Sequence, residues 1–219
     1  MTSRRILPPA LPPTFTVRAA LELGVSLHRL EAGDLRRPFH GIRTEVSAPE
    51  SLEADCRALG TRFRQGDAFT GPTAARLWGM PLPSSWERPS LLFVSSRSPT
   101  RAMRREGVVA STRLTGDPLL RGGVWVMPVW ETCLVLGRQL RPDDLTAVID
   151  FVVTGELGRH PLSSLSRLDD FLEHSGRRPG LDSLRRARGV ARRGAWSRPE
   201  THLRLLCLRA GLPEPLLNQ

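Results

Sequence analysis

Hydrophobic positions near the start of the chain repeat twice at helical spacing, with a glycine between the two repeats. After a proline-rich start, Val17 to Leu23 has the apolar spacing of a helix, and Thr16 suits its N-cap. Gly24 tolerates positive φ and can therefore end this helix, while Ser26 can cap a second helix over residues 27–32. The pattern predicts two short helices joined by a tight turn.

The spacing of small and apolar residues across this turn fits a helix-turn-helix. Ala20 is small where a second helix would cross the first, and Gly24 follows four residues later. Val25 fills the angle between the helices, and Leu30 supplies an apolar core position five residues further on. Because each of these positions holds a residue of the required type, DNA binding is the favoured interpretation. The alternative is a small helical hairpin beside a solvated basic loop.

In this register, the front of the second helix would face the major groove of double-stranded DNA. Arg29 is the natural reader of guanine, and Ser26 and His28 are placed to contact bases or phosphate. Residues 36–43 are predicted to form a short β wing whose arginines lie against the phosphate backbone. The predicted DNA-binding residues are therefore Ser26, His28, Arg29, Arg36, Arg37, His40 and Arg43.

The rest of the chain predicts a mixed unit followed by helices. Helices are expected over residues 52–59 and 73–78, and strands over 90–95, 107–110 and 123–127. The pattern then becomes helical, over residues 131–140, 142–153, 162–174, the centre of 177–193, and 199–210.

These elements predict an α+β fold in three parts. Residues 1–47 would hold the proline-rich lead-in and a winged helix-turn-helix, and residues 48–175 a mixed α/β middle domain. Residues 176–219 would hold an arginine-rich linker and a helical C-terminal remnant.

Charge strengthens the expectation of a nucleic-acid partner. The 219 residues include no lysine, so arginine supplies all 32 basic side chains and a net charge of +10. Such an excess attracts polyanions, and the arginine fork matches phosphate and guanine edges. The arginines of residues 177–193 would add nonspecific affinity for phosphate.

Other classes of function find little support in the sequence. No apolar run is long enough to cross a membrane, and the start lacks the apolar stretch of a secretory signal, so we expect a cytoplasmic protein. Cys56, Cys133 and Cys207 lie too far apart to indicate a disulfide framework or a zinc site. Phosphate-loop, dinucleotide and zinc-protease motifs are missing, so we expect no catalytic residues, metal or cofactor.

The N-terminal motifs resemble those of AbiEi-type antitoxins, which belong to type IV toxin–antitoxin systems of actinobacteria. The resemblance rests on Phe15-Thr-Val-x-x-Ala-x-x-x-Gly24-Val-Ser-x-x-x-Leu30 and on the segment from Ala68 to Gly79. It implies a winged helix that represses its own operon, and a cognate toxin neutralised by the second domain. A later motif is only partly kept, because Met127 and Val129 replace the usual polar residues.

The tail from Trp196 to Pro213 is similar to the first helix of nucleases related to very-short-patch-repair endonucleases. In that family the acid matching Glu200 assists metal chemistry, but the main metal ligands lie on later strands, and none follows before Gln219. Ser197-x-x-Glu200 also reads as a capping box, which explains the glutamate structurally. We therefore expect a regulator rather than an enzyme.

Two alternatives remain open from the sequence. One is a fragment of a fused DNA endonuclease, and the other is a protein-interaction module that does not bind DNA. The sequence does not indicate the oligomeric state or the DNA target.

Overall fold

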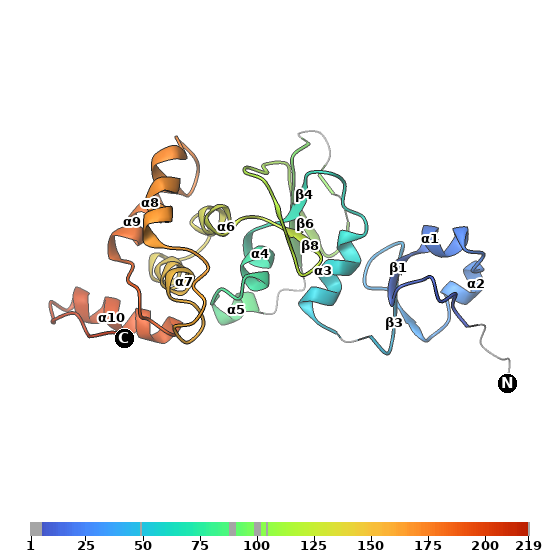
Figure 1. The fold of residues 1–219 in the computed structure, drawn as a ribbon, viewed down its shortest axis with the longest axis horizontal. Helices are drawn as coiled ribbons and strands as arrows, with labels where there is room; N and C mark the ends of the chain where they lie inside the picture. Colours follow the sequence, from blue (N-terminus) through green and yellow to red (C-terminus); the bar gives the residue numbers. More distant parts are fainter. Residues whose placement is uncertain (1–5, 49, 88–90, 99–101, 104, 219) are drawn as a thin grey trace.

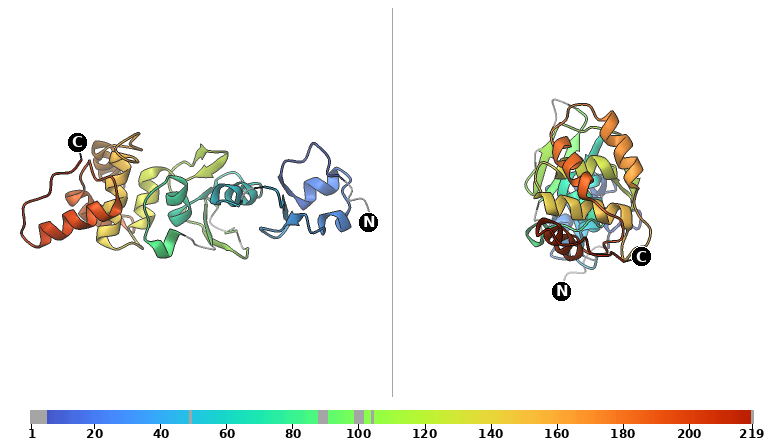
Figure 2. Two further views of the ribbon diagram at one scale, coloured as in Figure 1. Left: turned by 90° about the horizontal axis from the view of Figure 1, so that it is seen from below. Right: turned by 90° about the vertical axis from the view of Figure 1, so that its left-hand side faces the viewer.

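The chain folds as a mixed α+β protein with two sheets, arranged in three groups of elements along its longest axis (Figure 1). The computed structural model describes residues 6–218 apart from 49, 88–90, 99–101 and 104. The N-terminal group, the central sheet and the C-terminal helices follow one another in chain order (Figures 1 and 2). The general α+β expectation is thus confirmed.

The N-terminal group combines two one- to two-turn helices with a small sheet. Its elements are β1 (Thr14–Thr16), α1 (Val17–Glu22), α2 (Leu27–Leu30), β2 (Leu35–Arg36) and β3 (Ile42–Glu45). Strand β3 lies in the middle of the sheet and pairs antiparallel with both β1 and β2. β1 was not predicted, and α2 is shorter than expected because it ends before Glu31.

The predicted turn chemistry between α1 and α2 is confirmed. Thr16 caps α1 by accepting a hydrogen bond from the backbone N–H of Ala19, and Ser26 caps α2 in the same way from Arg29. Gly24 has a φ of +78°, a conformation that costs other residues steric strain. Both helices therefore begin at the caps that the sequence indicates, and the turn at Gly24 separates them.

A small hydrophobic cluster holds this group together. Ala20, Val25 and Leu30 are all buried, and they pack with Phe15 of β1 and Leu35 of β2. The first three are the positions that the spacing assigned to the inside. The helices thus close over the sheet through these buried positions, whereas Leu23, after the last residue of α1, is 48% exposed.

The central group is built on a mixed five-stranded sheet with the strand order β6-β5-β4-β8-β7. The sheet pairs are antiparallel for β4–β5 and β7–β8 and parallel for β4–β8 and β5–β6. The elements are α3 (Leu52–Gly60), β4 (Asp67–Phe69), α4 (Gly71–Leu77), α5 (Ser84–Glu87), β5 (Leu92–Ser96), β6 (Val108–Ser111), β7 (Leu119–Arg121) and β8 (Val124–Val126).

The C-terminal group is helical, and α7 is its central element. Its helices are α6 (Val129–Leu136), α7 (Pro142–Thr154), α8 (Leu165–His174), α9 (Leu181–Val190) and α10 (Arg198–Arg209). Leu145, Val148, Ile149 and Val152 of α7 are fully buried, as their spacing predicted. Both α9 and α10 pack against α7.

The arginine-rich segment forms helix α9, as the helical pattern at its centre predicted. Leu181, Leu184 and Ala187 of α9 are buried in the same cluster as α6, α7 and α8. The arginines lie on the opposite, outward side; Arg185 and Arg186, for example, are exposed. Packing is therefore continuous across the boundary expected near residue 175, because one face of α9 is apolar.

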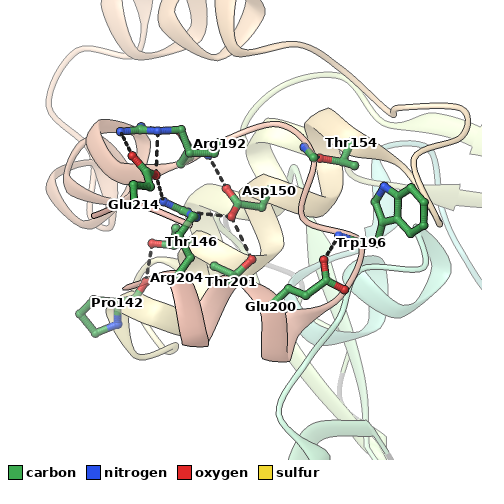
Figure 3. Close-up of polar contacts among 12 residues, drawn as sticks. Pro142, Thr146, Asp150, Thr154, Arg192, Trp196, Glu200, Thr201, Arg204 and Glu214 are labelled. Atoms are coloured by element: carbon green, nitrogen blue, oxygen red, sulfur yellow. Dashed lines mark hydrogen bonds and ion pairs between the residues drawn. The ribbon is translucent and has the colours of Figure 1, made fainter. Parts of the chain in front are cut away.

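A buried polar network joins α7 to α10 and to the chain after it (Figure 3). Asp150 accepts hydrogen bonds from the backbone N–H of Arg192, from Thr201 and from the guanidinium of Arg204, the last at 2.9 Å. Arg204 also pairs with Glu214 at 2.9 Å, and its side chain is fully buried. Since the charges of this network pair with one another, we assign it a structural role.

Candidate nucleic-acid interface

Helix α2 presents its first turn to solvent. Ser26, Leu27 and His28 are exposed, whereas Leu30 on the opposite side is buried. The cap at Ser26 fixes the start of the helix, and the turn at Gly24 directs it away from α1. This arrangement leaves one polar side chain, one apolar side chain and one imidazole available for contact with a ligand.

Arg29 does not share that exposure. Its guanidinium donates two hydrogen bonds to the carboxylate of Asp34, both at 2.9 Å, and its side chain is only 11% exposed. A bidentate pair of this kind fixes the plane of the guanidinium and occupies its fork. The guanidinium of Arg29 therefore links α2 to the residue before β2, and its donors to Asp34 are already engaged within the protein.

Arg43 and Arg36 of the hairpin are engaged with the protein itself. Arg43 donates from Nε to the carbonyl of Leu30, at the end of α2, at 2.6 Å. Burial is the main reason that the pKa of Arg43 lies below its usual range, and repulsion by Arg37 adds to it. Arg36 pairs with Glu50 at 2.6 Å and also donates to the carbonyl of Ala48.

Arg37 and His40 are the two predicted hairpin residues that lie exposed. They flank Phe39, whose ring packs into the hydrophobic cluster of the central group with Cys56 and Leu92. The carbonyl of His40 accepts a hydrogen bond from Arg105 at 2.9 Å. The loop of the hairpin is thus anchored on the central group.

Of the seven predicted DNA-binding residues, the structure brings Ser26 and His28 together on one exposed turn and Arg37 and His40 on one exposed loop. The other three hold these elements in place. Asp34 lies five residues after Arg29, a spacing that a search for ion-pair partners along the sequence would have shown.

A groove opens between this loop and the central group. Its volume is about 930 Å³. Its lining includes Arg36, Arg37 and His40 from the hairpin, and Arg76 and Arg105 from the central group. Arg76 and Arg105 were not predicted as site residues, because nothing in their local pattern places them beside the hairpin.

Comparison with known proteins gives no match. Neither models of protein families, nor curated proteins, nor solved structures resemble this chain significantly. Any functional conclusion therefore rests on the residues and on their geometry.

Membrane-spanning helices and clusters of metal-ligating side chains are both absent from the described residues. Within the described ranges, no helix has the length and apolar character needed to cross a membrane. The same ranges contain no group of three or more histidine, cysteine, aspartate or glutamate side chains that could hold a metal ion.

Glu200 has a structural use at the start of α10. The hydroxyl of Ser197 accepts from the backbone N–H of Glu200, and the carboxylate of Glu200 accepts from the backbone N–H of Trp196 at 3.1 Å (Figure 3). Asn218 donates to the same carboxylate at 2.8 Å. The predicted capping interaction is confirmed, with the refinement that the glutamate reaches one residue before the cap.

Proposed function

We propose that the chain is a DNA-binding transcriptional regulator whose N-terminal group acts as a winged helix-turn-helix. The observation that carries the proposal is the exposed first turn of α2, held by the buried set Ala20, Val25 and Leu30 beside a β hairpin. In such modules the N-terminal residues of the second helix contact base edges in the major groove. The net charge of +10 supports a polyanionic partner.

Within this proposal the predicted residues take different roles. Ser26, Leu27 and His28 face the bases, with the serine and imidazole supplying hydrogen bonds and the leucine an apolar contact. Arg37 faces the phosphate backbone. Arg29 and Arg43 act as positioning residues that fix α2 against the hairpin.

We further propose a role of the antitoxin type, in which the chain represses its own operon. This step rests on the resemblance of the N-terminal motifs to AbiEi-type antitoxins, and it makes a toxin the second partner. We propose no catalytic role, since Glu200 is committed to the start of α10.

The test uses the serine caps of two helices. Ser26→Asp keeps a side chain that caps well but adds a negative charge where DNA would lie. Ser164, which caps α8 in the same way, provides the matched control Ser164→Asp in the C-terminal group. A mobility-shift titration with duplex DNA from upstream of the gene measures both variants.

We expect the parent chain and Ser164→Asp to bind this duplex alike, and Ser26→Asp to lose at least tenfold in affinity. His28→Ala should lose about 1–3 kcal/mol of binding free energy and relax the base preference at one position. Equal binding by both aspartate variants would contradict the proposal, as would a parent chain with no affinity for any duplex at low salt. A reporter behind the gene's own promoter, repressed by the parent and released by Ser26→Asp, tests autorepression.

A further inference from the structure

The groove between the hairpin loop and the central group gathers cations from three parts of the chain. Arg37 comes from the hairpin, Arg76 from the last turn of α4, and Arg105 from the segment before β6. Each of the three guanidinium groups has no carboxylate partner among the residues that the structure describes. The groove therefore collects three guanidinium groups that form no ion pair with the described residues.

Arg105 is repelled by a neighbouring cation and has no anion among the described residues to offset this repulsion. Its guanidinium is half-buried and donates to the carbonyl of His40, a neutral acceptor. Burial and the neighbouring Arg62 both lower its pKa. Arg62 also lies under the hairpin, where its guanidinium comes within 3.8 Å of the position that a Cβ on Gly41 would occupy. An anion in the groove would relieve this repulsion.

Three carboxylates also line the groove, but they oppose an anion less than their number suggests. Glu50 is neutralised by its ion pair with Arg36 at 2.6 Å. Burial raises the pKa of Asp55, against the opposing effect of the neighbouring charges of Arg36 and Arg76. Glu106 is exposed to solvent, where water and salt screen its charge.

Position identifies the class of anion. The hairpin of β2 and β3 connects the groove to α2. Arg37 of the groove lies in the loop between these strands, and Arg43 of β3 donates a hydrogen bond to the end of α2. We therefore take the flanking backbone of the duplex that α2 is proposed to contact as the occupant of the groove. Guanidinium groups bind phosphate oxygens through paired N–H donors.

We propose that Arg37, Arg76 and Arg105 hold backbone phosphates of the same duplex that α2 contacts, so that the central group takes part in binding DNA. The inference rests on the proposed function and extends it, since the sequence assigned no DNA contact to residues of the central group. The anchored loop, with Phe39 in the central cluster, keeps the two halves of the site in register.

The experiment measures how binding of the full chain to the upstream duplex depends on salt. The test variant is Arg76→Gln/Arg105→Gln, and the matched control Arg141→Gln/Arg167→Gln removes the same charge from exposed positions of the C-terminal group. Arg76→Gln alone is included because this side chain makes no hydrogen bond with the described residues. A thermal unfolding midpoint within a few degrees of the parent verifies that each variant is folded.

Each phosphate contact contributes about 0.9 to the slope of log K against log salt concentration. We expect the slope of the test variant to fall by about 1.8 and that of Arg76→Gln by about 0.9, with no change in the control. When salt is raised from 50 to 200 mM, the factor by which affinity falls should be roughly twelve times smaller for the test variant than for the parent.

A test variant with the slope of the control would overturn the inference. So would a groove that binds inorganic phosphate in calorimetry, and loses that binding in Arg76→Gln, while the DNA slope stays unchanged, since the site would then serve a small anion. Both outcomes leave the proposed function standing if Ser26→Asp still loses at least tenfold in affinity, so the two failures are distinguishable.

Discussion

Two aspartates of α7, Asp143 and Asp150, lie in opposite electrostatic surroundings. Asp143 accepts a hydrogen bond from Arg209 at 2.8 Å near the surface, and this bond holds its pKa below the usual range. Asp150 is buried, and the loss of hydration raises its pKa in spite of the hydrogen bonds from Arg204 and its other partners. Asp143, the more exposed group, should therefore titrate at a lower pH than the buried Asp150.

The consequences for stability have opposite signs. The contribution of Asp143 is fully present above the unfolded-state pKa near 3.8 and is lost as the pH falls through its lower folded-state pKa. For Asp150 the folded state binds its proton more tightly than the unfolded state does, so its contribution to stability decreases as the pH rises through the window above 3.8.

Carboxyl-carbon NMR titrations of the parent chain and of Arg209→Gln test this assignment. We expect the variant to raise the pKa of Asp143 toward its ordinary value and to leave Asp150 unchanged, because Arg209 contacts only the first of the two. An Asp143 that titrates identically in both chains would show that the ion pair with Arg209 does not form in solution.

At the scale of elements, the turn between α1 and α2 depends on the backbone of Gly24. Its φ is +78°, and no atom lies within 4 Å of the position that a Cβ would take. Gly24→Ala therefore isolates the conformational cost, which we expect to reduce the free energy of unfolding by about 1 kcal/mol.

The control for this substitution is Gly33→Ala. Gly33 also has open space around its Cβ position but lacks a positive φ, so alanine there should be neutral or slightly stabilising. Urea denaturation of both variants gives the comparison. Equal effects at the two positions would contradict the role assigned to the turn.

Local signals explain which elements the sequence could predict. Caps, turn glycines and apolar spacing act within a few residues, and they located α1, α3, α7 and the start of α10. The strands β1 and β4 were missed because each has three residues and pairs with a strand distant in the sequence. Strand β7 was also missed, although it forms a tight hairpin with β8 across Gly122 and Gly123. A short strand has no periodicity of its own to read.

The difference between local signals and long-range contacts also explains which parts of the candidate site could be predicted. The outward turn at Ser26 and His28 follows from the helix register and was predicted. The ion pair of Arg29 with Asp34 and the contribution of Arg76 and Arg105 depend on how separate elements meet, which the hydrophobic pattern does not encode.

At the scale of the whole molecule, Phe39 links the N-terminal group to the central group. Its ring packs beside Leu52, Phe69 and Leu92, and the hydrogen bond from Arg105 to the carbonyl of His40 lies next to it. Helix α3 also contacts β1 and β3. Because Phe39 is the apolar side chain of the hairpin loop that packs on the central cluster, we infer that the orientation of the first turn of α2 depends on it.

Phe39→Ala should therefore release the N-terminal group without unfolding it. We expect lower rotational correlation times for amides of residues 14–45 in NMR relaxation, with those of the C-terminal helices unchanged. DNA affinity should fall by about tenfold if both groups contact one duplex. A variant whose two groups still tumble together would show that other contacts suffice.

The most direct test of the account is to map where DNA touches the protein. Amide chemical shifts of the uniformly labelled chain are followed as upstream duplex DNA is added. The account predicts that the largest changes fall on Ser26 to Glu31 and on residues 36–43, with smaller ones at Arg76 and Arg105. Changes confined to the exposed arginines of α9, with α2 unaffected, would contradict it.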